Sequence, residues 1–268
     1  MSKHVFDEAI ALTPAGPDLY RGRTHPGYGN MVGPFGGVTA AQALQAVLLH
    51  PDLLGEPVSL TVNYAAALAD GPFEVKAHAA RTNRSTQHWQ IEMLQDGAVT
   101  LTGTALTALR RDTWGTDDVH MPQVPPPGDL ARVTRHGGVE WVKRYDARPI
   151  TGSFPEVWDG SEHEALSRLW MRDDPPRTLD FASLVAMADF FFPRIWLRRA
   201  RHTPAGTVSI TVYFHVGAQQ LRDTGSGYLM GQAAGQGYHN GFFDQTAQIW
   251  NEAGLLLATT SQIVYYKE

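Results

Sequence analysis

The chain has 268 residues, an apolar share of 43% and a formal net charge of −5. These values are typical of a globular protein with one large or two small domains, and they exclude the basic surface that a nucleic-acid partner requires. The first residues, MSKHVFDEAI, lack the apolar core of a secretory signal, and no apolar run reaches the length of a membrane span. The absence of cysteine excludes disulfides, thiolate metal sites and a cysteine nucleophile, and it fits the cytoplasmic location that we expect.

The first half of the chain contains a helix-compatible segment followed by strands. The segment GGVTAAQALQAVLLH begins at Gly36, and the alternating stretch SLTVNY begins at Ser59. Alternation of this kind is typical of a half-buried strand. The half closes with DGAVTLTGTALTAL, which predicts a hairpin turn and a final strand.

The second half repeats this order after a proline-rich linker containing VPPPGDL. VEWVKRYDARPI and LSRLWMRDD predict two strands, and LDFASLVAMADFFFPRIWL is again compatible with a helix. SITVYF, from Ser209, and EAGLLLATTSQIVYY then match the strands of the first half. We therefore predict an N-terminal domain over 1–112, a linker over 113–137 and a C-terminal domain over 138–268. Each domain is a helix packed on an antiparallel sheet, an α+β fold, and the two together form a pseudo-dimer.

Asp189 is the one acidic residue in the apolar stretch ASLVAMADFFFPRIW. If the stretch is a helix, its neighbours on the same face include Val185, Ala186 and Phe192, so no polar face is available. An unpaired carboxylate in such surroundings costs several kcal/mol. Three interpretations follow from the residues alone: a helix end before Pro193, a cap for a neighbouring element, or a functional acid.

Standard nucleophile and metal motifs are missing from the sequence. The tetrapeptide DTGS at 223–226 resembles the aspartic-protease signature, but it has no second copy and no apolar strand before it, so we interpret it as a hairpin turn. There is no GxSxG elbow, and the eleven histidines show no HExxH or other ligand spacing. Gly231, Gly235 and Gly237 have the wrong spacing for a dinucleotide loop.

Two long stretches resemble the bacterial acyl-CoA thioesterase II family, the TesB-like enzymes. The resemblance runs from LYRGRTHPGYGNMVGPFGGVTAAQAL through the first strands, and from VEWVKRYDARPI to the C-terminus. It implies a double hotdog, in which each of two tandem domains is a long helix wrapped by an antiparallel sheet. It also implies hydrolysis of acyl-CoA thioesters to free acid and CoA, with no cofactor and no metal.

The resemblance further implies a water-binding trio in the second domain. Its Asp corresponds to Asp189 in MADF, its Thr to Thr207 in GTVSITVYFH, and its Gln to Gln262 in ATTSQIV. When the two halves are aligned, Pro57 occupies the position of Thr207 and Ala105 that of Gln262. The first half therefore lacks the trio, and we expect one site per chain. An Asp in apolar surroundings is a better base than one in bulk water, because desolvation raises its pKa.

We expect oxyanion donors from backbone N–H groups at the start of the first helix, where Gly36 and Gly37 permit close approach of a carbonyl. The alternative is that these glycines only allow tight packing. The chain departs from some relatives at SLTVNYAAAL, where they carry a histidine, and at the Ala-Asp that follows, where they often carry Arg-Pro.

Three other functions are alternatives to hydrolysis. Hydration of enoyl-CoA pairs an Asp with a nearby histidine, and none occurs here between Asp189 and His202. A protein that binds acyl-CoA or acyl-carrier thioesters without cleaving them is the main alternative. A protein of assembly only would leave Asp189 unexplained. By analogy, we expect a homodimer or higher homo-oligomer with acyl-CoA as its small-molecule partner.

Overall fold

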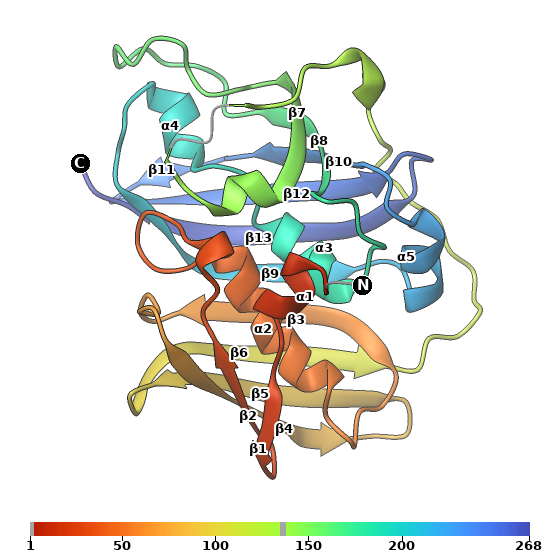
Figure 1. Cartoon of the computed structure of the whole chain (residues 1–268). Helices are drawn as coiled ribbons and strands as arrows, with labels where there is room; N and C mark the ends of the chain where they lie inside the picture. The colour runs from red at the N-terminus through yellow and green to blue at the C-terminus, as the bar shows by residue number, and fades with distance from the viewer. Residues whose placement is uncertain (1–2, 135–137) are drawn as a thin grey trace.

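The computed structural model describes residues 3–134 and 138–268. Figure 1 shows an N-terminal half, in red to yellow, below a C-terminal half in green to blue. Each half is an antiparallel sheet curved around helices, as the repeat in the sequence predicts. The last residues of the predicted linker, 135–137, lie outside the described residues.

The strands follow the alternating segments of the sequence. The N-terminal half contains β1 (Thr13–Gly16), β2 (Leu19–Arg23), β3 (Glu56–Tyr64), β4 (Pro72–Thr82), β5 (Thr86–Gln95) and β6 (Ala98–Ala108). The C-terminal half contains β7 (Tyr145–Thr151), β8 (Ser167–Asp173), β9 (Ala205–Phe214), β10 (Leu229–Ala234), β11 (Tyr238–His239), β12 (Phe242–Asn251) and β13 (Leu256–Tyr266). The predicted hairpin before β6 is confirmed. It turns at Asp96 and Gly97, whose positive φ values of 51° and 80° suit these residue types.

The described strands form one continuous antiparallel sheet in the order β1-β2-β4-β5-β6-β3-β9-β13-β12-β10-β8-β7, with β11 beside β12. The two halves join where β3 pairs with β9. Thr61 lies directly opposite Thr211 in this pair, and their hydroxyls are 2.9 Å apart. The pairing is symmetric about this point, so it defines a pseudo-two-fold axis that relates the two halves.

The helices are α1 (Val5–Ala9), α2 (Gly36–Leu48), α3 (Phe181–Ala188), α4 (Arg194–Arg199) and α5 (Ala218–Thr224), with 3-10 turns η1 (Pro26–Tyr28), η2 (Pro127–Asp129) and η3 (Trp141–Arg144). Helices α2 and α3 lie against each other on the inner face of the continuous sheet (Figure 1). Every residue of α3 is buried, which explains its lack of a polar face. The two central helices and the inner faces of the strands form the main core.

The helix predicted across Asp189 is shorter than expected. Helix α3 ends at Ala188, Asp189 is its C-cap, and a separate helix α4 begins only at Arg194. Pro193 explains the break, because proline lacks an N–H and disfavours helical geometry in the residue before it. Asp189 therefore lies at a helix end, as one of the three interpretations predicted.

Two smaller predictions were wrong. The DTGS tetrapeptide is the end of α5 rather than a hairpin turn, and Gly225 caps the helix with a φ of 66°. The strand predicted over VEWVKRYDARPI begins only at Tyr145, because Trp141–Arg144 form the turn η3. Gly and Asp occur both in hairpins and at helix ends, so the tetrapeptide alone does not distinguish them.

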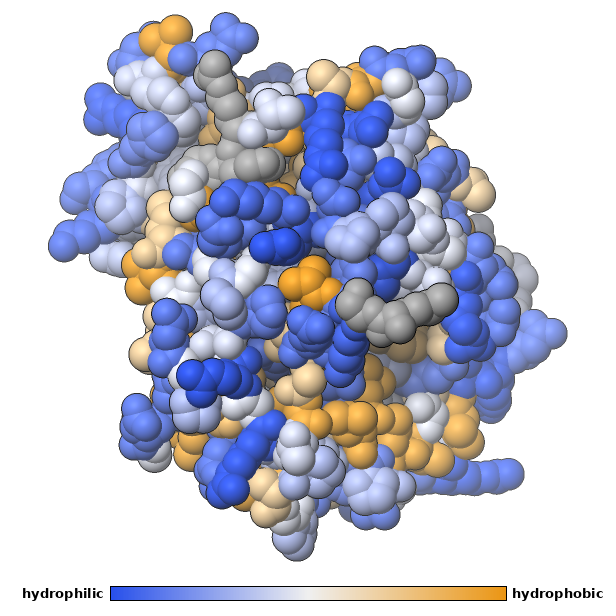
Figure 2. Space-filling model, in the orientation of Figure 1, coloured by the Kyte–Doolittle hydropathy of each residue, from blue (hydrophilic) through white to orange (hydrophobic). Residues whose placement is uncertain are grey.

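The surface is mixed in character. Figure 2 shows one face, on which hydrophilic residues predominate and apolar residues gather mainly over the N-terminal half. Among the described residues, no helix is long and apolar enough to cross a membrane.

Candidate active site

The Asp189 carboxyl group lies at the end of α3, where the chain leaves the helix. The backbone turns here, with the Asp189 and Phe190 N–H groups bonded to the carbonyls of Ala186 and Met187 at 3.3 and 3.1 Å. Asp189 remains partly exposed although the residues on either side of it are buried. The break in the helix therefore places a carboxylate in apolar surroundings with part of its surface accessible.

Gln262 is the direct polar partner of Asp189. Its Nε2 donates a hydrogen bond to Asp189 Oδ1 at 3.0 Å. Gln262 lies on β13 opposite Ile210 of β9, and only 3% of it is exposed. The structure therefore brings together two of the three residues that the resemblance selected, from elements 73 positions apart.

The start of α2 lies against the same carboxylate. A Cβ added at Gly36 would stand 2.7 Å from Asp189 Oδ2, and one at Gly37 would stand 2.5 Å from the Ala186 carbonyl oxygen. A side chain at Gly37 would push α2 and α3 apart, and one at Gly36 would displace the Asp189 carboxylate. The backbone N–H of Gly37 is directed at the Asp189 carboxylate. The predicted glycine pair therefore lies at the site, but one of its N–H groups already interacts with the acid.

The electrostatic setting of Asp189 is unusual for a carboxyl group. Withdrawal from water raises its pKa to about 7, although the hydrogen bonds from Gln262 and the Gly37 N–H act in the opposite direction. No cationic side chain in the described part of the chain is among the causes of this shift. The carboxyl group therefore titrates near neutrality, which suits a general base.

Thr207 lies further along the same inner sheet face. It pairs with Val264, two residues beyond Gln262, and a bulge at Val208 turns its side chain to that face. In the part of the chain that the structure describes, its hydroxyl makes no hydrogen bond to Asp189 or Gln262. The structure thus places Thr207 near the pair without joining it to them.

The described residues of the first half hold no second copy of this arrangement. Ile210 corresponds to Leu60 across the pseudo-two-fold axis, and their partners on the next strands are Gln262 and Ala105. The bulge recurs in β3, where Pro57 occupies the position of Thr207. The alignment of the two halves made from sequence is confirmed by this register.

Tyr64 is a site residue that sequence reasoning missed. Its hydroxyl donates to the Gly36 carbonyl oxygen at 2.8 Å, and burial, with a further contribution from the Asp189 charge, raises its pKa well above the ordinary value. Tyr64 ends β3 on the same face as the buried Leu60 and Val62. The alternation in SLTVNY could have placed it on the inner face, but only the fold shows that this face meets Asp189.

Aromatic rings cluster beside the site. Phe35, just before the glycine pair, stacks on Trp141 with ring centroids 4.1 Å apart. Phe190, just after Asp189, lies 5.3 Å from both Trp141 and Tyr145. These rings come from both halves and from the turn η3, so the site is flanked by an apolar wall at the junction of the two domains.

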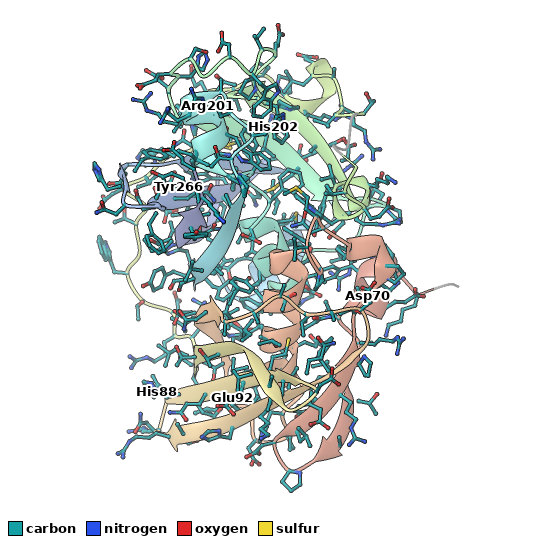
Figure 3. The ribbon with its side chains drawn as sticks, turned by 90° about the vertical axis from the view of Figure 1, so that its left-hand side faces the viewer. Asp70, His88, Glu92, Arg201, His202 and Tyr266 are labelled. Carbon is teal, nitrogen blue, oxygen red and sulfur yellow. The ribbon has the colours of Figure 1, made fainter. Side chains whose placement is uncertain are left out.

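The arginines that follow Asp189 in sequence do not reach it. Arg198 pairs with Glu162 at 2.7 Å and Arg199 with Glu268 at 3.2 Å. In Figure 3, Arg201 and His202 lie together at the outer end of the C-terminal half. This segment is a solvated, ion-paired surface.

Comparison with known families identifies both halves. The family model described as "Acyl-CoA thioesterase C-terminal domain" matches residues 117–266, and the model of the N-terminal domain matches residues 25–108. No curated protein sequence matches the chain. The fold and the two domain matches define a double-hotdog thioester hydrolase.

Solved structures agree with this class. A hotdog-fold protein of unknown function from Alicyclobacillus acidocaldarius is 44% identical, with a TM-score of 0.94 over 100% of this chain and 99% of that one. The fold is shared by a putative thioesterase II from Thermobifida fusca, which is 21% identical with a TM-score of 0.81 over 98% of this chain and 97% of that one. It is also shared by the acyl-CoA thioesterase II TesB2 from Mycobacterium marinum, which is 18% identical with a TM-score of 0.79 over 98% of each chain. The chain belongs to the acyl-CoA thioesterase family, and acyl-CoA thioester hydrolysis is its general activity.

Proposed function

We propose that this enzyme hydrolyses acyl-CoA by a water molecule that Asp189 activates, with Gln262 and Thr207 orienting that water. The observation that carries the proposal is the Asp189 carboxyl group, held by Gln262 in apolar surroundings at the end of α3. A carboxyl group that titrates near neutrality can take a proton from water and still be regenerated at the same pH.

The reaction requires no covalent enzyme intermediate. Asp189 removes a proton from the water as its oxygen attacks the thioester carbonyl carbon. The tetrahedral intermediate then collapses, the C–S bond breaks, and the proton passes from Asp189 to the leaving sulfur. The products are the free acid and CoA, so atoms and charges balance. General-base assistance of this kind is worth about a hundred- to ten-thousand-fold.

The developing oxyanion needs positive partners, and we assign these to the start of α2. The first N–H groups of a helix have no partner within the helix, and the helix dipole favours negative charge there. Gly36 and Gly37 let a carbonyl approach these groups closely. Because the Gly37 N–H already faces Asp189, the carbonyl oxygen would bind beside that carboxylate, which brings it close to the attacking water.

The proposal includes the cellular location, the metabolic role and the assembly of the enzyme. A cytoplasmic location is supported by the absence of cysteine. A role in fatty-acid metabolism and assembly as a homodimer or higher homo-oligomer rest on analogy with other hotdog proteins.

The test is hydrolysis of a panel of short- to long-chain acyl-CoA thioesters, followed with a thiol-reactive dye. The protein has no cysteine, so every thiol detected comes from released CoA. We expect turnover of at least one substrate by the wild type and its loss in a folded Asp189→Asn variant. Binding of acyl-CoA without turnover by the wild type would favour the binding-protein alternative.

A further inference from the structure

One peptide group connects the first domain to the Asp189 carboxylate. The Gly36 carbonyl oxygen accepts a hydrogen bond from the Tyr64 hydroxyl at 2.8 Å, and the next N–H, of Gly37, is directed at Asp189. This carbonyl and this N–H belong to the same planar peptide unit and point in opposite directions. A bond at the carbonyl end therefore fixes the direction of the N–H end.

The same bond also polarises the peptide. Hydrogen bonds in a chain strengthen one another in surroundings of low dielectric constant. A donor at the Gly36 carbonyl oxygen makes the Gly37 N–H a better donor to the carboxylate. Tyr64 is only partly exposed and comes from β3, so the first domain contributes to the site of the second.

The pseudo-two-fold axis shows that Tyr64 has no functional counterpart. Thr61 and Thr211 lie on the axis, so Tyr64 corresponds to Phe214 three positions further along the other strand. Phenylalanine has the same ring and no hydroxyl. The hydroxyl is therefore present only in the half whose helix start meets Asp189, whereas α3 begins at its own cap, Asp180.

We propose that Tyr64 is a positioning residue for catalysis. Its hydroxyl holds the Gly36–Gly37 peptide so that the Gly37 N–H points at the Asp189 carboxylate. Tyr64 does not act on the substrate. It sets the orientation and the proton affinity of the base through one intervening peptide. The inference rests on the proposed function, because it assumes that Asp189 is the base.

Other groups also face Asp189. Tyr145 on β7 interacts electrostatically with it, and the Gln262 amide on β13 bonds to it directly. Neither contacts the Gly36 carbonyl oxygen among the contacts of the described residues. Loss of the Tyr64 hydroxyl therefore weakens one stabilising donor of the carboxylate and leaves the others in place, so the proton affinity of Asp189 should rise.

The experiment compares Tyr64→Phe with Tyr213→Phe by measuring kcat, KM and the pH profile of kcat/KM for a hydrolysed acyl-CoA. Tyr213 lies on the adjoining strand β9, is half exposed, and undergoes the same chemical change away from the site. For Tyr64→Phe we expect kcat at neutral pH to fall about three- to tenfold, the effect of one hydrogen bond, with KM little changed. The midpoint of the rising acid limb should move to higher pH.

The outcomes separate the inference from the proposed function. An unchanged midpoint and a kcat equal to that of Tyr213→Phe would overturn the positioning role while leaving hydrolysis intact. A merely structural role would lower the melting temperature without moving the midpoint. A wild type that hydrolyses nothing would instead contradict the proposed function. If Tyr64→Phe does not fold, Tyr64→Met, which is also apolar and adapts its shape, allows the same comparison.

Discussion

The two domains share one framework and differ most at the starts of their central helices. Helix α3 begins with a conventional cap, in which the Asp180 carboxylate accepts a hydrogen bond from the Ser183 N–H at 2.8 Å. Helix α2 begins with Phe35 and two glycines, and it has no side-chain cap. One of the N–H groups that a cap would satisfy in α2, that of Gly37, faces the Asp189 carboxylate of the other domain.

The C-terminal ends of α2 and α3 also differ. Helix α2 runs on to Leu48, whereas α3 stops at Ala188 and exposes Asp189. One helix therefore supplies an uncapped start and the other supplies an acid at its end. Among the described residues, the duplicated fold therefore forms one composite site, to which each domain contributes a different part.

Removal of the acid should have the largest effect. Asp189→Asn is expected to lower kcat by about a hundred- to ten-thousand-fold, because the amide cannot accept the proton of water. The folded state raises the pKa of Asp189 from 3.8 to about 7, so the wild type loses stability as pH rises through that interval. The variant should therefore melt at a higher temperature than the wild type at pH 8, as scanning calorimetry can show.

A matched control for this variant is Asp96→Asn. Asp96 lies exposed in the hairpin before β6, with a positive φ that asparagine tolerates. It should change neither kcat nor the melting temperature. Loss of activity in both variants would show that the effect of Asp189 is not specific to the site.

A side chain at the start of α2 should have the next largest effect. In Gly36→Ala the new methyl group would stand 2.7 Å from Asp189 Oδ2, so the carboxylate must move. Displacement of a catalytic group by about 1 Å can cost about a hundredfold in rate. Steady-state kinetics should show a fall in kcat of that order, whereas Gly115→Ala, with no atom within 4 Å of the added Cβ, should behave as the wild type.

Substitutions of Gln262 and Thr207 should lower kcat by different amounts. Gln262→Met removes a hydrogen bond to a carboxylate, which is worth about tenfold or more in kcat. Thr207→Val should cost less, because its hydroxyl makes no hydrogen bond to the Asp189–Gln262 pair in the described structure. Equal losses in the two variants would show that Thr207 moves into contact during the reaction.

The cap of the other helix should affect stability more than activity. Asp180→Ala removes the N-cap of α3 and an ion pair with Arg177, at a cost of about 1 kcal/mol in the free energy of unfolding. Chemical denaturation measures this change. A fall in kcat as large as that of Gly36→Ala would show that the start of α3 is functional rather than only structural.

Sequence patterns predicted the fold better than they predicted the site's boundary. The repeat, the register of Pro57 and Ala105 against Thr207 and Gln262, and the glycine pair could all be inferred, because strands alternate and only glycine permits close approach. The contact between Gln262 and Asp189 was implied only by family resemblance. Local patterns do not specify which strand face meets which helix end.

Tyr64 illustrates what the sequence lacked. Its position on an inner face followed from alternation, but its role depends on a contact between β3 and α2, 28 residues apart. The end of α3 at Ala188 was only one of the three interpretations that the sequence left open for Asp189. Apolar residues on both sides of Asp189 favour a continuous helix, but α3 ends at Ala188, five residues before Pro193.

The most direct test of a water-activating Asp189 is the pH dependence of kcat/KM for the wild-type enzyme. Protonation removes the base, so activity should rise with pH along a limb whose midpoint is near 7, the raised pKa of Asp189. A single limb with that midpoint, absent from the residual activity of Asp189→Asn, is the predicted result. A profile that stays flat from pH 5 to pH 9, or a midpoint near the ordinary aspartate value of about 4, would contradict it.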